Sequence, residues 1–86
     1  MEVSKRLRRA RAELAIADEQ LGALNEAADD ARIRSLVSET PLAGKEYHEA
    51  RRHAEAMTGA QQSLAGQVRR LESELDELLD KLGPGP

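Results

Sequence analysis

The amino-acid sequence predicts an all-α protein, a two-helix antiparallel coiled-coil hairpin. Two segments carry an unbroken heptad repeat of apolar residues, one proline-containing turn signal separates them, and Ala, Leu, Glu and Arg dominate the composition. The 86 residues make one domain at most. Because the chain is this short, we expect a thin core; the single Tyr and the absence of Phe and Trp also suit long helices better than an α/β core.

The first segment is predicted to be a helix over about residues 2–38. Its apolar stripe advances in alternating steps of four and three residues, which is the 3.5-residue period of a coiled coil. The stripe consists of Val3, Leu7, Ala10, Leu14, Ala17, Leu21, Leu24, Ala28, Ala31 and Ser35.

The turn is expected at about residues 39–40. Pro41 cannot continue the first helix, because it lacks an amide N–H and clashes with the preceding turn. Proline is favourable at the first position of a helix, and Thr40 is a suitable N-cap. A second helix over about residues 41–82 follows, and we expect residues 83–86, which read Gly-Pro-Gly-Pro, to be a disordered tail.

The second helix repeats the heptad pattern of the first. Its stripe consists of Tyr47, Ala50, Ala54, Met57, Gln61, Leu64, Val68, Leu71, Leu75, Leu78 and Leu82. Since a short connection makes sequential helices antiparallel neighbours, the two stripes should face each other. Pairing Leu7 with Leu78 gives layers in which the two residue numbers add to 85, and this is the register we expect.

A basic run occupies the start of the first helix: Lys5, Arg6, Arg8, Arg9 and Arg11. In the expected register it lies level with an acidic strip of the second helix, Glu72, Glu74, Asp76, Glu77 and Asp80, with Arg11 across from Glu72. We expect these charges to neutralise one another. The net charge of −3 also argues against a general nucleic-acid binder.

Several classes of function are disfavoured by the composition. No cysteine means no disulfide framework and no zinc–thiolate site, and His48 with His53 supplies too few ligands for a metal. No catalytic constellation or phosphate-binding loop is recognisable, so we expect neither an enzyme nor a cofactor. The sequence shows neither an apolar leader nor a membrane span, so we expect a cytoplasmic protein. Its Arg and Ala content suggests a bacterial source.

The tip of the hairpin is the first candidate binding surface. Four apolar residues outside the stripes cluster near Pro41: Ile33, Leu36, Val37 and Leu42. They either fold over the end of the hairpin above Tyr47 or stay exposed for a partner. Arg34, Glu39 and Arg51 complete the predicted tip site, and Arg32 and Arg51 should lie across one side of the seam.

A face in the middle of the rod is the second candidate. It combines small and uncharged residues from both helices: Ile16, Gln20, Ala23, Ala27, Ala56, Ala60, Ser63 and Gln67. Such a face suits close packing of a second hairpin, which would form a homodimeric four-helix bundle, or it simply meets water; the sequence leaves both open.

The residues after the turn resemble those of a known family. Glu46, Tyr47, His48, Ala50 and Arg51 match the start of the second helix in the N-terminal coiled-coil domain of the bacterial Gre transcript-cleavage factors. That domain is also an antiparallel hairpin. The resemblance implies a protein that inserts its tip into the RNA polymerase secondary channel.

The chain departs from the Gre pattern at the tip. Thr40 and Ala43 stand at the positions that would align with the family's metal-holding acids, Glu39 is the only acid close by, and the globular C-terminal domain is missing. The resemblance therefore implies a channel-binding modulator without cleavage stimulation. The broader hypothesis is a protein-interaction module that self-associates or docks its tip on a larger assembly.

Overall fold

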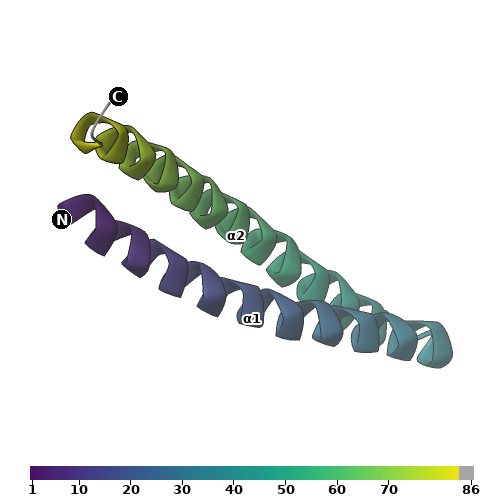
Figure 1. The fold of residues 1–86 in the computed structure, drawn as a ribbon. Helices are drawn as coiled ribbons and strands as arrows, with labels where there is room; N and C mark the ends of the chain where they lie inside the picture. The colour runs from purple at the N-terminus through teal and green to yellow at the C-terminus, as the bar shows by residue number, and fades with distance from the viewer. Residues whose placement is uncertain (84–86) are drawn as a thin grey trace.

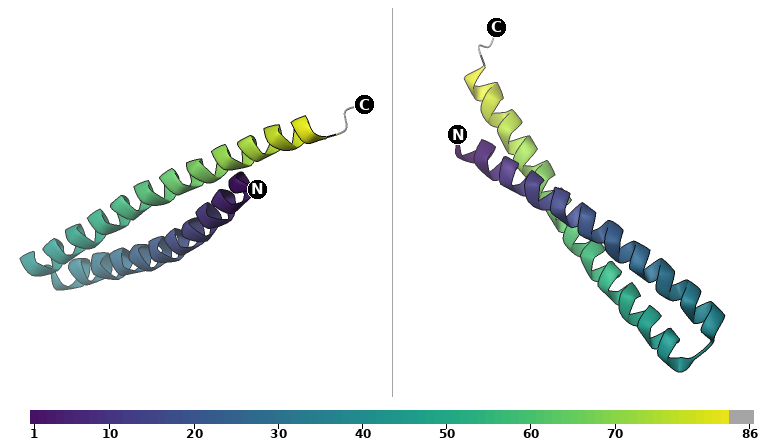
Figure 2. Two further views of the ribbon diagram at one scale, coloured as in Figure 1. Left: turned by 90° about the vertical axis from the view of Figure 1, so that its left-hand side faces the viewer. Right: turned by 90° about the horizontal axis from the view of Figure 1, so that it is seen from below.

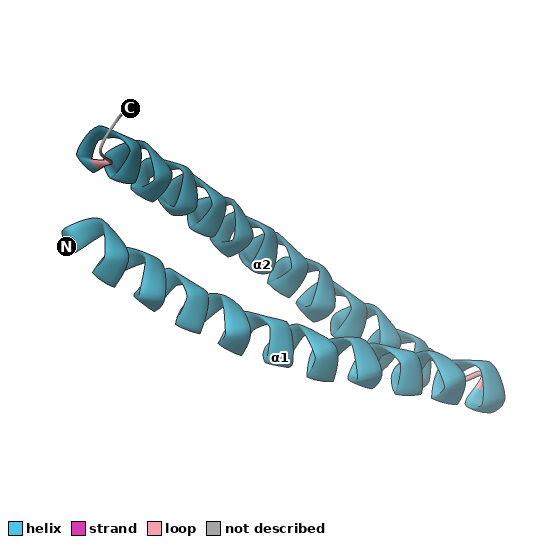
Figure 3. Cartoon of the chain, viewed as in Figure 1, coloured by secondary structure: helices cyan, strands magenta, loops and turns pink. Residues whose placement is uncertain are grey.

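The computed structural model describes residues 1–83 and consists of two antiparallel helices, α1 (Glu2–Ser38) and α2 (Pro41–Leu82) (Figure 1). Within residues 1–83 there is no strand, and the connection is a short loop (Figure 3). The predicted all-α helical hairpin is confirmed. The expected tail residues 84–86 lie outside the described part. At 1.5 Å per residue, the 42 residues of α2 are about 63 Å long.

The two apolar stripes form the contact between the helices. Every predicted stripe residue of α1 is buried or half-buried, and so is every one of α2 except Leu82. The heptad periodicity therefore located the contact face correctly, because α1 and α2 pack on each other along their length.

The hydrophobic core lies in the half of the rod that contains the two termini. Its buried residues are Val3, Leu7, Ala10, Val68 and Leu71, with Leu14, Leu75 and Leu78 packed against them. Toward the turn the buried residues are only alanines, namely Ala31, Ala43 and Ala54. Since apolar burial contributes about 25 cal/mol per Å², the larger side chains of the terminal half supply most of the stabilisation.

The turn is closed by backbone geometry and one side-chain cap. Glu39 adopts a left-handed conformation (φ 51°, ψ 32°), and its N–H donates to the Ser35 carbonyl oxygen at 3.0 Å. Thr40 is extended, and its Oγ1 accepts a hydrogen bond from the Ala43 N–H at 3.2 Å. Pro41 then occupies the first helical position, as expected.

The register of the two helices differs from the expected one by a heptad. Gln61 Nε2 donates to Asp18 Oδ1 at 3.1 Å, so these residues lie nearly level. Ala43 is buried, and it can only be covered if the end of α1 lies beside it. Leu82 is 73% exposed, because no turn of α1 reaches it. In each layer, the two residues that face each other thus have numbers that add to about 78, not to 85.

The length of the connection explains the correct register. Two residues between Ser38 and Pro41 leave these helix ends level, and facing residues must then have numbers that add to about 79. A shift by one heptad still leaves the stripe of α1 opposite the stripe of α2. The stripes alone therefore cannot distinguish the two registers, and the connection decides between them.

Candidate functional site

The tip carries an exposed apolar cluster. Ile33, Leu36, Val37 and Leu42 are between 53% and 79% exposed. The alternative in which they fold over the end of the hairpin is therefore wrong, since each of them stays more than half exposed. Arg34 and Glu39 are exposed among them. We call these six residues the tip cluster.

The heptad positions explain why the tip cluster is exposed. Ser35 and Ala31 of α1 face α2, so the neighbouring residues at positions 33, 36 and 37 point away from it. Leu42 is the second residue of α2, and the short connection separates it from Val37 near the end of α1. Exposed apolar side chains are thus present on both helix ends at the tip.

Tyr47 does not lie beneath the tip, contrary to the expectation. It is half-buried one heptad further along the rod, where it lines a shallow depression with Ala28, Asp29, Arg32 and Arg51. Its ring also stacks on that of His48, with the ring centroids 5.7 Å apart. The shifted register accounts for this, because it places Tyr47 level with Ala31 and not with Ser38.

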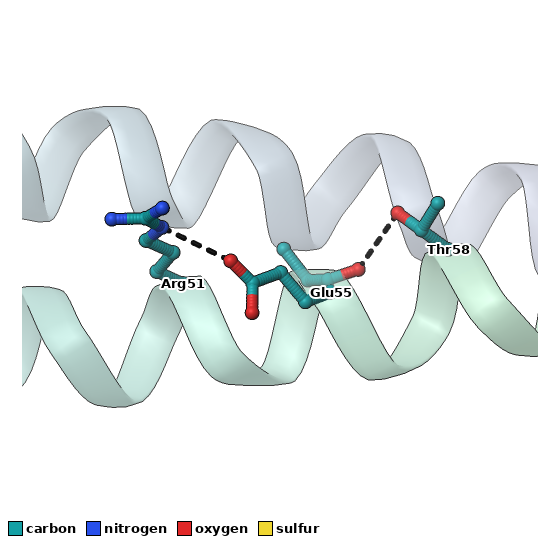
Figure 4. A network of polar contacts seen from close by, with 4 residues as sticks. Arg51, Glu55 and Thr58 are labelled. Atoms are coloured by element: carbon teal, nitrogen blue, oxygen red, sulfur yellow. Dashed lines mark hydrogen bonds and ion pairs between the residues drawn. The ribbon is translucent and has the colours of Figure 1, made fainter.

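Arg32 and Arg51 line the same depression, as the sequence suggested. Arg51 Nε donates to Glu55 Oε1 at 3.0 Å, one turn further along α2, and Thr58 Oγ1 donates to the Ala54 carbonyl oxygen at 3.0 Å (Figure 4). Because Glu55 holds Arg51 and Asp29 also lines the depression, the two arginines sit among compensating carboxylates. Arg51 is therefore part of a local polar network, separate from the tip cluster.

The mid-rod face is exposed over all eight of its predicted residues. Ile16 is the largest of them and is 56% exposed. Because the register differs from the expected one by a heptad, the α2 residues of this face are displaced along the rod relative to its α1 residues. Ile16 now lies level with Gln62 rather than with Arg69, and the predicted face is less compact than expected.

The predicted charge neutralisation holds at one position. Arg11 Nη2 and Glu72 Oε2 form an ion pair at 2.9 Å, as expected, and it is the one ion pair between the two helices within residues 1–83. Side chains of a helix lean toward its N-terminus, so these long side chains converge although their backbones are not level. The remaining acids of the strip lie level with the start of α1 and beyond it.

The acidic and histidine side chains of the described residues do not gather into a metal-binding group. Within residues 1–83 no group of three or more His, Asp or Glu side chains could hold a metal ion. His48 and His53 are both exposed. In the described part of the chain, neither helix combines the length and the apolar character needed to cross a membrane.

Comparison of the chain with protein-family models, with curated proteins and with solved structures finds no match.

One exposed surface was not predicted from the sequence, and it lies at the end of the rod opposite the tip. Leu79 is 50% exposed and Leu82 is 73% exposed, near the half-exposed Met1. The signal was present in the predicted helix lengths. Because α2 is five residues longer than α1 and the connection is short, the end of α2 must extend past the start of α1.

Proposed function

We propose that this protein is a non-catalytic interaction module that docks its hairpin tip on a protein partner. The observation that supports this proposal is the exposed tip cluster, in which four large apolar side chains gather at the end of a charged rod. Clustered apolar residues on a surface often mark sites of protein contact. A narrow rod, 14 Å across in its thinnest direction, is suited to reach into a groove.

The tip cluster has the composition of a small interface. Full burial of a Leu, Ile or Val side chain contributes about 1.5–3 kcal/mol, and Leu36, Val37 and Leu42 are all exposed enough to gain from it. Arg34 and Glu39 supply charges at the edge of the apolar surface, where they would set orientation and exclude wrong partners.

Two substitutions test the tip without disturbing the helices. Leu42→Asp places a carboxylate at the N-terminus of α2, and Val37→Lys places a cation at the C-terminus of α1; both charges are favourable to the helix dipole. We expect each to abolish capture of the partner from a native lysate while circular dichroism stays unchanged.

The matched control is Ile16→Lys, which changes another apolar residue that is more than half exposed, far from the tip. A photo-crosslinking residue at position 42 should mark the captured partner directly. Equal capture by the wild type and both tip variants, or cross-linking from position 16 but not from position 42, would refute the tip as the docking site.

A second candidate is a modulator of RNA polymerase, and the specific observation is the local motif. Glu46, Tyr47, His48, Ala50 and Arg51 resemble the Gre stretch and lie in the half of the rod that contains the tip. In this candidate, RNA polymerase is the partner and the tip enters its secondary channel. Tyr47→Ala and Leu42→Asp should then both remove co-purification with RNA polymerase, and retention by both variants would exclude it.

The proposed module acts in the bacterial cytoplasm. The support comes from composition, because the chain has no cysteine and uses Arg and Ala heavily. Fractionation of the native host would test the location, and recovery of the protein in a periplasmic or secreted fraction would contradict it.

A further inference from the structure

The end of the rod opposite the tip carries an overhang. α2 has 42 residues and α1 has 37, and the last turns of α2 extend past the start of α1 in both views of Figure 2. The apolar stripe of α2 continues into this overhang through Leu78 and Leu82, with Leu79 beside it. Leu79 and Leu82 are half or more exposed, so the stripe runs on where α1 no longer covers it.

The register segregates charge at this end. Residues 67–73 of α2, which include Arg69 and Arg70, lie level with the basic run of α1, and the acids lie further out. A basic band results, made of the exposed residues Lys5, Arg6, Arg8, Arg9, Arg11, Arg69 and Arg70, with Glu72 among them on Arg11. An acidic end follows it, made of the exposed residues Glu74, Asp76, Glu77 and Asp80, where Lys81 offsets one charge.

We infer that the overhang docks on a second copy of this chain, so that two hairpins pair through their terminal halves about a two-fold axis. In this arrangement the acidic end of each copy lies against the basic band of the other, and Leu79 and Leu82 leave water. The contact is self-complementary, because each copy supplies both the acidic apolar segment and the basic segment.

The two-fold pairing also fits the size of the chain. A two-helix hairpin of this length buries a small core, and association is a common way for such small folds to gain stability. The pairing leaves both tip clusters free at the outer ends, so it goes beyond the proposed tip function and would make the module bivalent.

A second copy fits this end better than a nucleic acid does. Phosphates would be attracted by the basic band, yet the adjacent acidic end would repel them, and the whole chain carries a net charge of −3. The exposed Leu79 and Leu82 need an apolar cover that a phosphate backbone does not offer.

Charge reversal and recombination test the inference by sedimentation equilibrium of the full chain. The acid-reversed variant carries Glu77→Lys and Asp80→Lys, and the base-reversed variant carries Arg6→Glu and Arg9→Glu; Arg11 and Glu72 keep their ion pair. The wild type should dimerise at micromolar concentrations, more weakly as salt rises. Each variant alone should raise the dimer Kd about tenfold or more. An equimolar mixture should restore the dimer, because each overhang then meets a band of opposite charge.

Restoration in the mixture cannot arise from a variant that has merely lost its fold. A wild type that stays monomeric up to about 100 µM would overturn the inference. Reversed variants that dimerise as the wild type does, with Ile16→Lys monomeric, would overturn it in favour of the mid-rod face. A monomeric wild type whose binding to a mixed-sequence oligonucleotide is lost in the base-reversed variant would overturn it in favour of a nucleic acid.

Discussion

Glu39 is a residue at which side-chain identity and backbone conformation conflict. Its φ of 51° lies in the left-handed region, which costs an L-residue with a Cβ roughly 1–2 kcal/mol and costs glycine almost nothing. The hydrogen bond from its N–H to the Ser35 carbonyl oxygen compensates in part, since it satisfies an otherwise free helix-end acceptor. The turn is therefore strained at one residue.

Glu39→Gly should relieve this strain and stabilise the hairpin. We expect the free energy of unfolding to rise by about 0.5–1 kcal/mol, measured by urea denaturation followed by circular dichroism. Ser38→Gly is the control, because Ser38 is the last helical residue of α1 and has no positive φ. A Glu39→Gly variant less stable than the wild type would show that Glu39 is not left-handed in solution.

Thr40 contributes to stability through one hydrogen bond, from the Ala43 N–H to its Oγ1. Removing the hydroxyl leaves an N-terminal donor of α2 without its cap, so Thr40→Ala should lower the free energy of unfolding by about 1 kcal/mol. Thr40→Ser keeps the acceptor and should stay within about 0.5 kcal/mol of the wild type. Equal losses in both variants in urea denaturation would assign the effect to the methyl group and not to the cap.

At the scale of the helices, periodicity alone predicted the stripe, whereas the register also required the length of the connection. Leu7 and Leu71 are buried because their heptad positions face the other helix, and periodicity alone identifies such positions. Which layer of α2 faces Leu7 depends on the connection, since a shift of one heptad leaves the apolar pattern intact. The distance from Ser38 to Pro41 in the chain contained that information.

For the tip cluster, too, one part could be predicted from the sequence and another could not. Its location could be predicted, because Ile33, Leu36, Val37 and Leu42 lie outside the stripes near the turn. Their exposure could not be predicted, since it depends on how the two helix ends lie relative to each other in space, which the apolar pattern does not specify. The left-handed Glu39 was also not predictable, because a glutamate carries no signal for that conformation.

The core of the hairpin should respond to truncation in its terminal half. Leu71 is 3% exposed and belongs to the core cluster, so Leu71→Ala should lower the free energy of unfolding by about 2–5 kcal/mol. Leu36→Ala, at the exposed tip, should change it by no more than about 0.5 kcal/mol. Urea denaturation at one fixed protein concentration checks both, and similar losses in the two variants would contradict the location of the core.

At the scale of the whole molecule, the hairpin has two chemically different ends. The tip presents apolar side chains with few charges, and the opposite end presents a basic band beside an acidic apolar overhang. Both proposed contacts depend on the same geometry, in which the chain reverses at residues 39–40 and α2 extends past α1. If the chain reversed its direction at other residues, the basic run of α1 would lie level with the acids of α2 and neutralise them. The end of α2 would then no longer extend past α1.

The distance between paired spin labels, measured by double electron–electron resonance, tests this geometry most directly. Because the chain has no cysteine, Ala15→Cys can be combined with either Gln62→Cys or Arg69→Cys at exposed positions, with excess unlabelled chain to suppress distances between copies. The shorter distance should belong to the pair with position 62, since position 69 lies one heptad, about 10 Å, further along α2. A shorter distance to position 69 would contradict the register, and a distance of about 70 Å between positions 15 and 62 would show one uninterrupted rod.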